Sequence, residues 1–269
     1  MITRQLNIRG IRYLVQIWGS GSAVLMLHGF TGSGQTLANL AQKLSGYQII
    51  APDLIGHGGT DAPTEVTRYS PDEQVADMAA LLDALHVPEV RLFGYSMGGR
   101  LALAFALVHQ HRVTRLVLES ASPGLRSEQE QRERRASDAS LADRIMNDGV
   151  TAFVDFWGQI PLFASQQRLS AQVRAQVRAG RICQREIGLV NSLLGFGTGS
   201  QPSFWNDLPR LSLQTTLLVG ELDEKYCQVA AKMAQIMPRC VVKRVPHVGH
   251  TVHLEALETA STILSEAFE

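Results

Sequence analysis

The sequence predicts an α/β protein with a mostly parallel sheet, flanking helices and a helical lid inserted between two strands. Short apolar runs such as residues 23–27 have the continuous hydrophobicity of parallel strands that are covered on both faces. Segments whose apolar residues recur at helical spacing, such as residues 71–85, alternate with these runs. After residue 118, about 90 residues carry helical patterns without a strand, which indicates an insertion.

Composition limits the class of protein and its partners. The 269 residues carry no net charge and 45% of them are hydrophobic, which suits a single domain with a substantial core. The neutral balance gives no reason to expect nucleic acid or an anionic membrane as a partner. No apolar run approaches the roughly 20 residues of a transmembrane helix, and the first residues lack a signal-peptide pattern. We therefore expect a cytoplasmic protein, and the sequence indicates no oligomeric state.

The cysteines give no sign of a disulfide framework or a metal site. There are three, an odd number, and none of them has C-x-x-C spacing. We expect free thiols in or near the core.

Taken in order, the chain first alternates apolar and polar residues around Arg9-Gly10, which predicts a β-hairpin or two short edge strands over residues 8–18. The remaining strands are expected at residues 23–27, 47–51, 90–93, 113–118, 215–219 and 240–245. Helices are expected at residues 71–85, 101–107 and 254–268, and in the insertion from residue 128 to about 194. These elements predict a first core part (1–121), a helical lid (122–206) and a second core part (207–269).

A Gly-Tyr-Ser-Met-Gly-Gly stretch at residues 94–99 is the strongest functional signal. A strand precedes it and an apolar helix follows, which is the context of a nucleophile elbow. The flanking glycines remove side chains that would clash in the sharp turn, and the turn lifts the Ser96 hydroxyl to the edge of the sheet. We therefore interpret Ser96 as a catalytic residue.

A His-Gly-Phe turn follows the strand at residues 23–27 and predicts half of an oxyanion hole. The backbone N–H of Phe30 can point back over the sheet, and the N–H of Met97, directly after the serine, would supply the other half. Alone, the turn could equally be an ordinary glycine-rich βα loop.

Three candidates stand at the ends of three predicted strands in the order Ser96, Asp223, His250. This is the order of a triad in which histidine accepts the serine proton and the acid fixes the histidine tautomer. Glu119 also ends a strand and is the alternative acid.

Other residues near strand ends compete for these roles. His247 and His253 flank the favoured histidine and could be packing or surface residues, although His253 could also line the site. Asp53 and His57 lie in a loop before the nucleophile, and we interpret them as loop-shaping residues.

Several further segments are specific enough to indicate a family. They are residues 94–100 (GYSMGGR), 119–125 (ESASPGL), 161–163 (PLF), 197–202 (GTGSQP) and 249–255 (GHTVHLE). Over nearly its full length the chain resembles the α/β-hydrolase superfamily, and these segments resemble the 2-succinyl-6-hydroxy-2,4-cyclohexadiene-1-carboxylate synthase family of menaquinone biosynthesis. The elbow is common to the superfamily, whereas Arg100 and residues 197–202 are more specific. One departure, Ile55 where proline is common, affects no catalytic residue.

The resemblance implies a lyase that needs no metal and no organic cofactor. Enzymes of this family remove the proton alpha to the succinyl ketone of a cyclohexene substrate and expel its enolpyruvyl group as pyruvate. Ser96, made basic by His250 and Asp223, would accept that proton. The N–H groups of Phe30 and Met97 would stabilise the enolate oxygen.

The substrate of that family is a small molecule with three carboxylates, which need cationic partners. Arg100 lies one helical turn beyond the nucleophile in an apolar helix, where a solvated arginine is hard to explain. By similarity, Arg134 and Arg181 are further carboxylate-binding residues, and Tyr95 and Trp157 are pocket walls. The residues alone leave alternatives, since Arg134 and Arg181 each have neighbouring arginines and Trp157 could simply pack the lid.

Two rival functions remain at this point. A serine hydrolase would use the same fold and triad to cleave an ester or a carbon–carbon bond through an acyl-enzyme. A noncatalytic binding protein on a hydrolase scaffold belongs to another class, and the intact set of catalytic residues argues against it.

Overall fold

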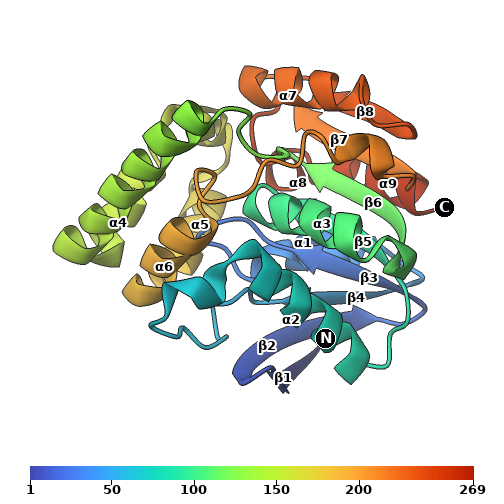
Figure 1. The fold of residues 1–269 in the computed structure, drawn as a ribbon, viewed down its shortest axis with the longest axis horizontal. Helices are drawn as coiled ribbons and strands as arrows, with labels where there is room; N and C mark the ends of the chain where they lie inside the picture. The colour runs from blue at the N-terminus through green and yellow to red at the C-terminus, as the bar shows by residue number, and fades with distance from the viewer.

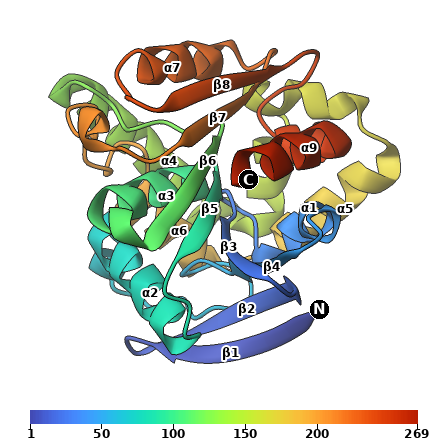
Figure 2. The same ribbon diagram turned by 90° about the vertical axis from the view of Figure 1, so that its right-hand side faces the viewer.

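The computed structural model describes residues 1–269 as an eight-stranded sheet with helices on both faces (Figures 1 and 2). The strand order is β1-β2-β4-β3-β5-β6-β7-β8. The strands are β1 (Ile2–Ile8), β2 (Ile11–Gly19), β3 (Ser22–Leu27), β4 (Tyr47–Pro52), β5 (Val90–Tyr95), β6 (Val113–Glu119), β7 (Thr215–Gly220) and β8 (Cys240–Val245). The hairpin β1–β2 joins β4 in antiparallel fashion, and the strands from β4 to β8 are parallel. The predicted mostly parallel sheet is confirmed.

Six helices cover the two faces of the sheet. They are α1 (Ala38–Lys43), α2 (Pro71–Ala84), α3 (Met97–Val108), α7 (Glu224–Ala234), α8 (Val252–Glu255) and α9 (Leu257–Phe268). Alternate residues of β3 divide the core in two, because successive strand side chains point to opposite faces. Leu25 packs into the cluster under α2, α3 and α7, whereas Met26 packs into the cluster under α1 and α9.

The expected C-terminal helix at residues 254–268 is wrong in one respect, because the structure divides it into α8 and α9. Ala256 separates them with φ −142° and ψ 63°. The short α8 is tied to the loop before it, where the Glu255 carboxylate accepts from the N–H groups of Gly249 and Thr251. The chain then turns at Ala256, so that α9 can lie along the sheet.

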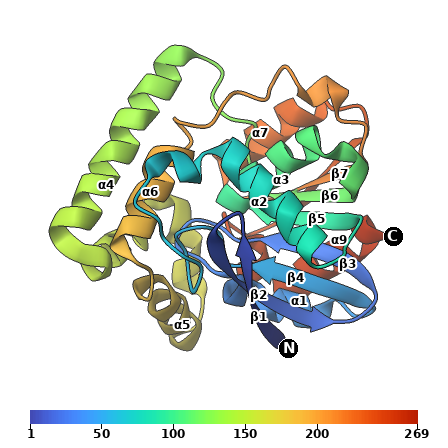
Figure 3. The ribbon, with the colours of Figure 1, turned by 60° about the horizontal axis from the view of Figure 1, so that its bottom comes forward.

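A helical insertion separates β6 from β7 and stands at one end of the molecule (Figures 1 and 3). It contains α4 (Glu128–Trp157), the 3₁₀ segment η4 (Pro161–Arg168), α5 (Ala171–Ile182) and α6 (Glu186–Phe196). A capping box between Ser127 and Glu130 starts α4 by satisfying N–H groups of its first turn. Helices α4 and α6 share a small apolar core of their own. The exact domain boundaries stay a prediction.

None of the helices is both long and apolar enough to cross a bilayer. All three cysteines are free, and Cys183 is exposed rather than in or near the core. It lies just beyond the end of α5, whose twelve residues include none that is buried.

Candidate active site

Ser96 stands in a strained turn between β5 and α3. Its backbone has φ 51° and ψ −109°, a region that residues with a side chain rarely occupy. The turn is tight because α3 packs directly on the end of β3. A Cβ at Gly98 would overlap the Leu27 carbonyl, so only glycine allows this approach. The serine hydroxyl is thereby placed at the carboxyl end of the parallel strands, as the sequence predicts for an elbow.

His250 and Asp223 complete a hydrogen-bonded chain with the serine. The His250 Nε2 atom lies 3.0 Å from the Ser96 Oγ, and its Nδ1 atom lies 2.5 Å from Asp223 Oδ2. Asp223 also caps α7, because its Oδ1 accepts from the N–H of Tyr226. Both His250 and Asp223 are buried. This geometry allows the histidine to take a proton from the hydroxyl while the acid orients the imidazole.

The loop that carries His250 is fixed on both sides of the residue. The two oxygens of Glu255 accept from the N–H groups of the residues directly before and after the histidine. The rings of Tyr226 and Phe163 pack against the imidazole, with centroids 4.8 Å and 6.0 Å away. The imidazole orientation is therefore set before a ligand binds.

The backbone N–H groups of Phe30 and Met97 are free to bind an oxyanion. Neither donates to a backbone or side-chain acceptor outside a regular element, and Met97 begins α3, so its N–H lacks a partner in a preceding turn. Both residues line the same cavity as Ser96. This arrangement is consistent with the predicted oxyanion hole.

The cavity beside the serine has a volume of about 320 Å³ and lies between the sheet and the insertion. Nine of its seventeen lining residues are hydrophobic, and the polar ones include several cations. The lining residues are Phe30, Ser96, Met97, Arg100, Arg134, Ser137, Leu141, Phe156, Trp157, Ile160, Leu162, Ser192, Leu193, Gly197, Thr198, Lys225 and Tyr226. A largely apolar pocket with a few polar groups is the usual form of a small-molecule site.

Arg100 is buried at this cavity without a carboxylate partner. Its Nη1 atom donates to the Phe196 carbonyl at 2.8 Å and to Gln201 Oε1 at 2.9 Å. The Gly-Thr-Gly-Ser-Gln-Pro segment therefore holds the arginine in place. Burial lowers the pKa of Arg100 to about 10, so that the guanidinium stays charged at neutral pH. A buried cation that has only neutral partners favours an anionic ligand.

Two more of the predicted residues line the cavity from α4. Arg134 donates from Nε to Asp138 at 2.7 Å, which orients the guanidinium and leaves its other N–H groups available. Trp157 stacks on Phe153, and its buried indole N–H has no partner. Phe30 packs edge-on against the same indole, with centroids 5.6 Å apart. The insertion thus contacts the loop that carries Phe30.

Two predicted pocket residues lie behind the lining. The Tyr95 hydroxyl is 2.7 Å from Thr251 Oγ1, and its ring packs against His250 rather than facing the cavity. Arg181 lies over the ring of Phe163 at 4.7 Å and makes no ion pair, and burial lowers the pKa of its guanidinium.

Residues that sequence reasoning left out also line the cavity. Lys225 and Tyr226 enter from the first turn of α7, directly after the acid, and Thr198 enters from the glycine-rich segment. The sequence does contain a sign of this position for Lys225. It follows Asp223 by two residues, and the first turn of a helix lies at the same end of the sheet as the strand end before it.

The competing triad candidates have other partners. Glu119 Oε1 accepts from the backbone N–H of His253 and lies 2.8 Å from the Nδ1 atom of the same residue, so these two residues pair with each other. Asp53 accepts from the N–H groups of Gly34 and Gly59, which fits the expected loop-shaping role. His57, in the same loop, is fully buried.

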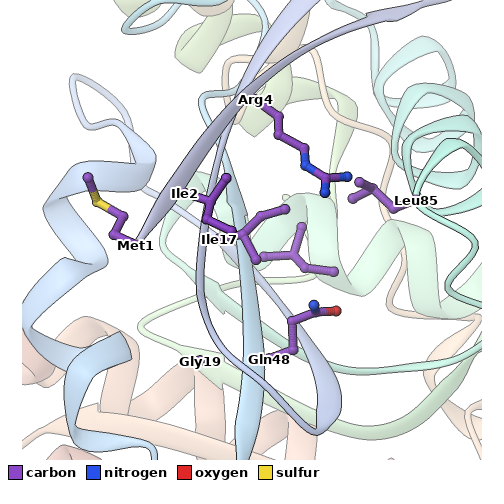
Figure 4. Close-up of a pocket in the computed structure, with 8 residues that line it drawn as sticks. Met1, Ile2, Arg4, Ile17, Gly19, Gln48 and Leu85 are labelled. Carbon is purple, nitrogen blue, oxygen red and sulfur yellow. The ribbon is translucent and has the colours of Figure 1, made fainter.

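A second pocket lies near the β1 edge of the sheet, by the N-terminus (Figure 4). Its eight lining residues come mainly from β1, β2 and β4 and include Ile2, Arg4, Ile17 and Gln48. It holds no nucleophile and no histidine. The side chains of the molecule also form no group of three or more metal-binding residues.

Comparison with known proteins agrees with this geometry. The family model described as the alpha/beta hydrolase fold matches residues 22–257. An Escherichia coli 2-succinyl-6-hydroxy-2,4-cyclohexadiene-1-carboxylate synthase is 30% identical over 86% of this chain and 88% of its own length. A Bacillus subtilis protein, provisionally given the same name, is 46% identical over 96% of this chain and 94% of its own.

The chain belongs to the α/β-hydrolase family, within the 2-succinyl-6-hydroxy-2,4-cyclohexadiene-1-carboxylate synthase group. Among solved structures, MenH from S. aureus has a TM-score of 0.89 and 33% identity, covering 93% of this chain and 96% of that one. A Thermogutta terrifontis esterase has a TM-score of 0.86 at 24% identity, which shows a shared fold only. Proteins named for different reactions therefore share this fold.

Proposed function

We propose that the protein eliminates pyruvate from 2-succinyl-5-enolpyruvyl-6-hydroxy-3-cyclohexene-1-carboxylate to form 2-succinyl-6-hydroxy-2,4-cyclohexadiene-1-carboxylate, a step of menaquinone biosynthesis. The main support for this proposal is that Ser96, in a hydrogen-bonded triad, shares a cavity with Arg100, which is buried and has no carboxylate partner. A base and a cation at one site suit proton abstraction from an anionic substrate. The names of the relatives support the same reaction.

The reaction is a 1,4-elimination in which electrons move along the ring. Ser96, with His250 accepting its hydroxyl proton, removes the proton from C2, alpha to the succinyl ketone. The C2–H electron pair forms the C2=C3 bond, and the former C3=C4 pair forms the C4=C5 bond. The C5–O bond then breaks, and the leaving enolpyruvate takes up a proton to become pyruvate.

The developing enolate needs stabilisation at the ketone oxygen. Phe30 and Met97 line the cavity beside the nucleophile, and their unpartnered N–H groups would supply two fixed donors. Because these donors are already oriented, they bind the charge without reorganisation at the moment of reaction. The hole that stabilises a tetrahedral acyl intermediate in a hydrolase would here stabilise an enolate.

The three substrate carboxylates require a cationic pocket. Arg100 and Arg134 line the cavity, and Arg181 lies over the ring of Phe163 as a third guanidinium without an ion pair. We infer that these arginines bind the carboxylates and that Trp157 donates its unpartnered indole N–H. We also infer that the enzyme acts on a small-molecule tricarboxylate in the cytoplasm.

Pyruvate release tests the proposal. The purified protein is expected to release pyruvate from the cyclohexene substrate well above the spontaneous rate, and a panel of p-nitrophenyl esters is expected to turn over negligibly. Ser96→Ala removes the base and should lower kcat/KM by at least about 10³-fold. Arg100→Ala should lower it by about 10²-fold or more, because a charge-assisted contact is lost.

The opposite pattern would identify a serine hydrolase. Efficient ester cleavage without pyruvate release above the spontaneous rate would mean that Ser96 acts as a nucleophile and not as a base. A protein that binds the substrate equally well with Ser96→Ala, and turns over neither class of substrate, would be a binding protein.

A further inference from the structure

A lysine at the rim of the cavity has no role in the mechanism above. Lys225 is the second residue of α7 and lines the same cavity as Ser96 and Arg134, although it remains exposed. Its ammonium group lies 5.7 Å from the centre of the Tyr226 ring, and it forms no ion pair with any carboxylate of the chain. All three of its N–H donors are therefore available to a ligand.

The position of this lysine is electrostatically unfavourable in the absence of an anion. The N-terminus of a helix carries partial positive charge, so a cation in the first turn is repelled by its own helix. Burial, and next the charge of Arg134, lower the pKa of Lys225, while Asp223 raises it. Two cations and a helix N-terminus thus face one space, and a bound carboxylate would relieve their repulsion.

The arginines of the cavity are partly engaged elsewhere. Arg134 gives one donor to Asp138, and Arg100 gives one nitrogen to the Phe196 carbonyl and to Gln201. These bonds fix the two guanidinium groups but reduce the donors left for a ligand. Of the three arginines inferred to bind carboxylates, only Arg100 and Arg134 line the cavity, whereas Arg181 lies over the ring of Phe163. Lys225 is therefore the third cation of the lining.

We propose that Lys225 binds a carboxylate of the substrate at the rim of the cavity and favours the tricarboxylate over analogues that lack one carboxylate. This inference rests on the proposed function. It adds a cation from the second core part to those of α3 and the insertion, so that the substrate is held from three sides.

Charge removal at Lys225 tests the inference. Lys225→Met keeps the length of the side chain and removes the charge, and it is expected to raise KM by about 10- to 100-fold with kcat changed by less than about threefold. Lys225→Arg keeps the charge and should stay within about fivefold of the wild type. Lys232→Met on the same helix is exposed, away from the cavity, and serves as the matched control.

The outcome against the inference is equally specific. A KM for Lys225→Met within twofold of the Lys232→Met value would overturn it. So would a loss confined to kcat that Lys225→Arg does not restore. An unchanged ratio of affinities for the tricarboxylate and a dicarboxylate analogue would overturn the specificity role.

Equilibrium binding separates this inference from the proposed function. The substrate is titrated into Ser96→Ala protein with and without Lys225→Met, and the double variant should bind about 10- to 100-fold more weakly. If the wild type releases no pyruvate but this difference is found, the proposed function fails and the lysine site stands. If both proteins bind equally, or neither binds, the lysine site fails.

Discussion

At the scale of single residues, Asp223 has two tasks that depend on separate oxygens. One oxygen caps α7 through the N–H of Tyr226, and the other accepts from His250. The cap requires only an acceptor, whereas the histidine contact requires a negative charge that fixes the tautomer and stabilises the imidazolium. The two tasks can therefore be separated by a substitution that keeps the shape of the side chain.

Asp223→Asn is predicted to lower kcat/KM for pyruvate release by roughly 10³- to 10⁴-fold, because an amide does not stabilise the charged imidazolium. The cap is kept, so we expect the free energy of unfolding to fall by less than about 1 kcal/mol. Steady-state kinetics and urea unfolding measure the two effects. Glu224→Gln at the adjacent, exposed residue is the control, and a similar kinetic loss there would contradict the assignment.

The arrangement of the proposed triad could be predicted from sequence, whereas the cavity lining could not. Ser96, Asp223 and His250 each follow a strand, and the parallel sheet brings strand ends together. Lining depends on side-chain direction and on how the insertion packs, which no spacing encodes. Tyr95 and Lys225 illustrate this difference, since the first was expected at the pocket and lies behind His250, and the second was unnoticed and lines it.

At the scale of elements, α4 contains a break that separates its long charged part from the part that carries Trp157. Gly149 has φ 78° and ψ 164°, a combination that is essentially restricted to glycine. The break lets residues 150–157 pack over the Phe30 loop while the first part of α4 runs along α6 (Figure 3). A glycine at position 149 therefore contributes to the shape of the cavity.

Gly149→Ala is predicted to lower the free energy of unfolding by about 1–3 kcal/mol, because a Cβ is strained in that conformation. Gly180 lies inside α5 with ordinary helical backbone and open space around it. Gly180→Ala should raise the free energy of unfolding by about 0.5–1 kcal/mol. Chemical denaturation of both variants measures the two free energies of unfolding. Equal changes would show that alanine adopts the backbone conformation of residue 149 without strain.

The sequence predicted strands better than helix ends. Buried parallel strands are continuous apolar runs, so β3 through β7 were located within a residue or two. The edge strand β8, which is largely exposed, was also located. The division between α8 and α9 was missed because it depends on a tertiary contact, the Glu255 carboxylate on the His250 loop. The break at Gly149 was missed because a single glycine inside a helical pattern is usually tolerated.

At the scale of the whole molecule, two buried neutral histidines make stability depend on pH. Burial lowers the pKa of His28 to about 4, and burial followed by the proximity of His28 lowers the pKa of His57 to about 3. The unfolded chain binds these protons near pH 6.5, so the folded state binds fewer protons between pH 6.5 and 4. The stability that depends on them is complete above pH 6.5 and is lost as the pH falls.

The free energy of unfolding is predicted to fall between pH 6.5 and 4 by up to about 1.4 kcal/mol per pH unit for each histidine. The pKa of Asp53 is raised by burial, which acts in the opposite direction as the carboxylate takes up its proton. His57→Gln should reduce by about half the slope of the free energy of unfolding against pH, whatever its effect on stability at pH 7. Urea unfolding at several pH values provides the slopes, and equal slopes would contradict the assignment.

The fold as a whole does not decide between elimination and hydrolysis, because esterases share it. The most direct test is the mass of the ring product that accompanies pyruvate release. Elimination predicts a cyclohexadiene whose mass equals that of the substrate less one pyruvate, and Ser96→Ala should slow its formation to near the spontaneous rate. A ring product heavier by one water would show that the enolpyruvyl group is hydrolysed and would contradict the lyase.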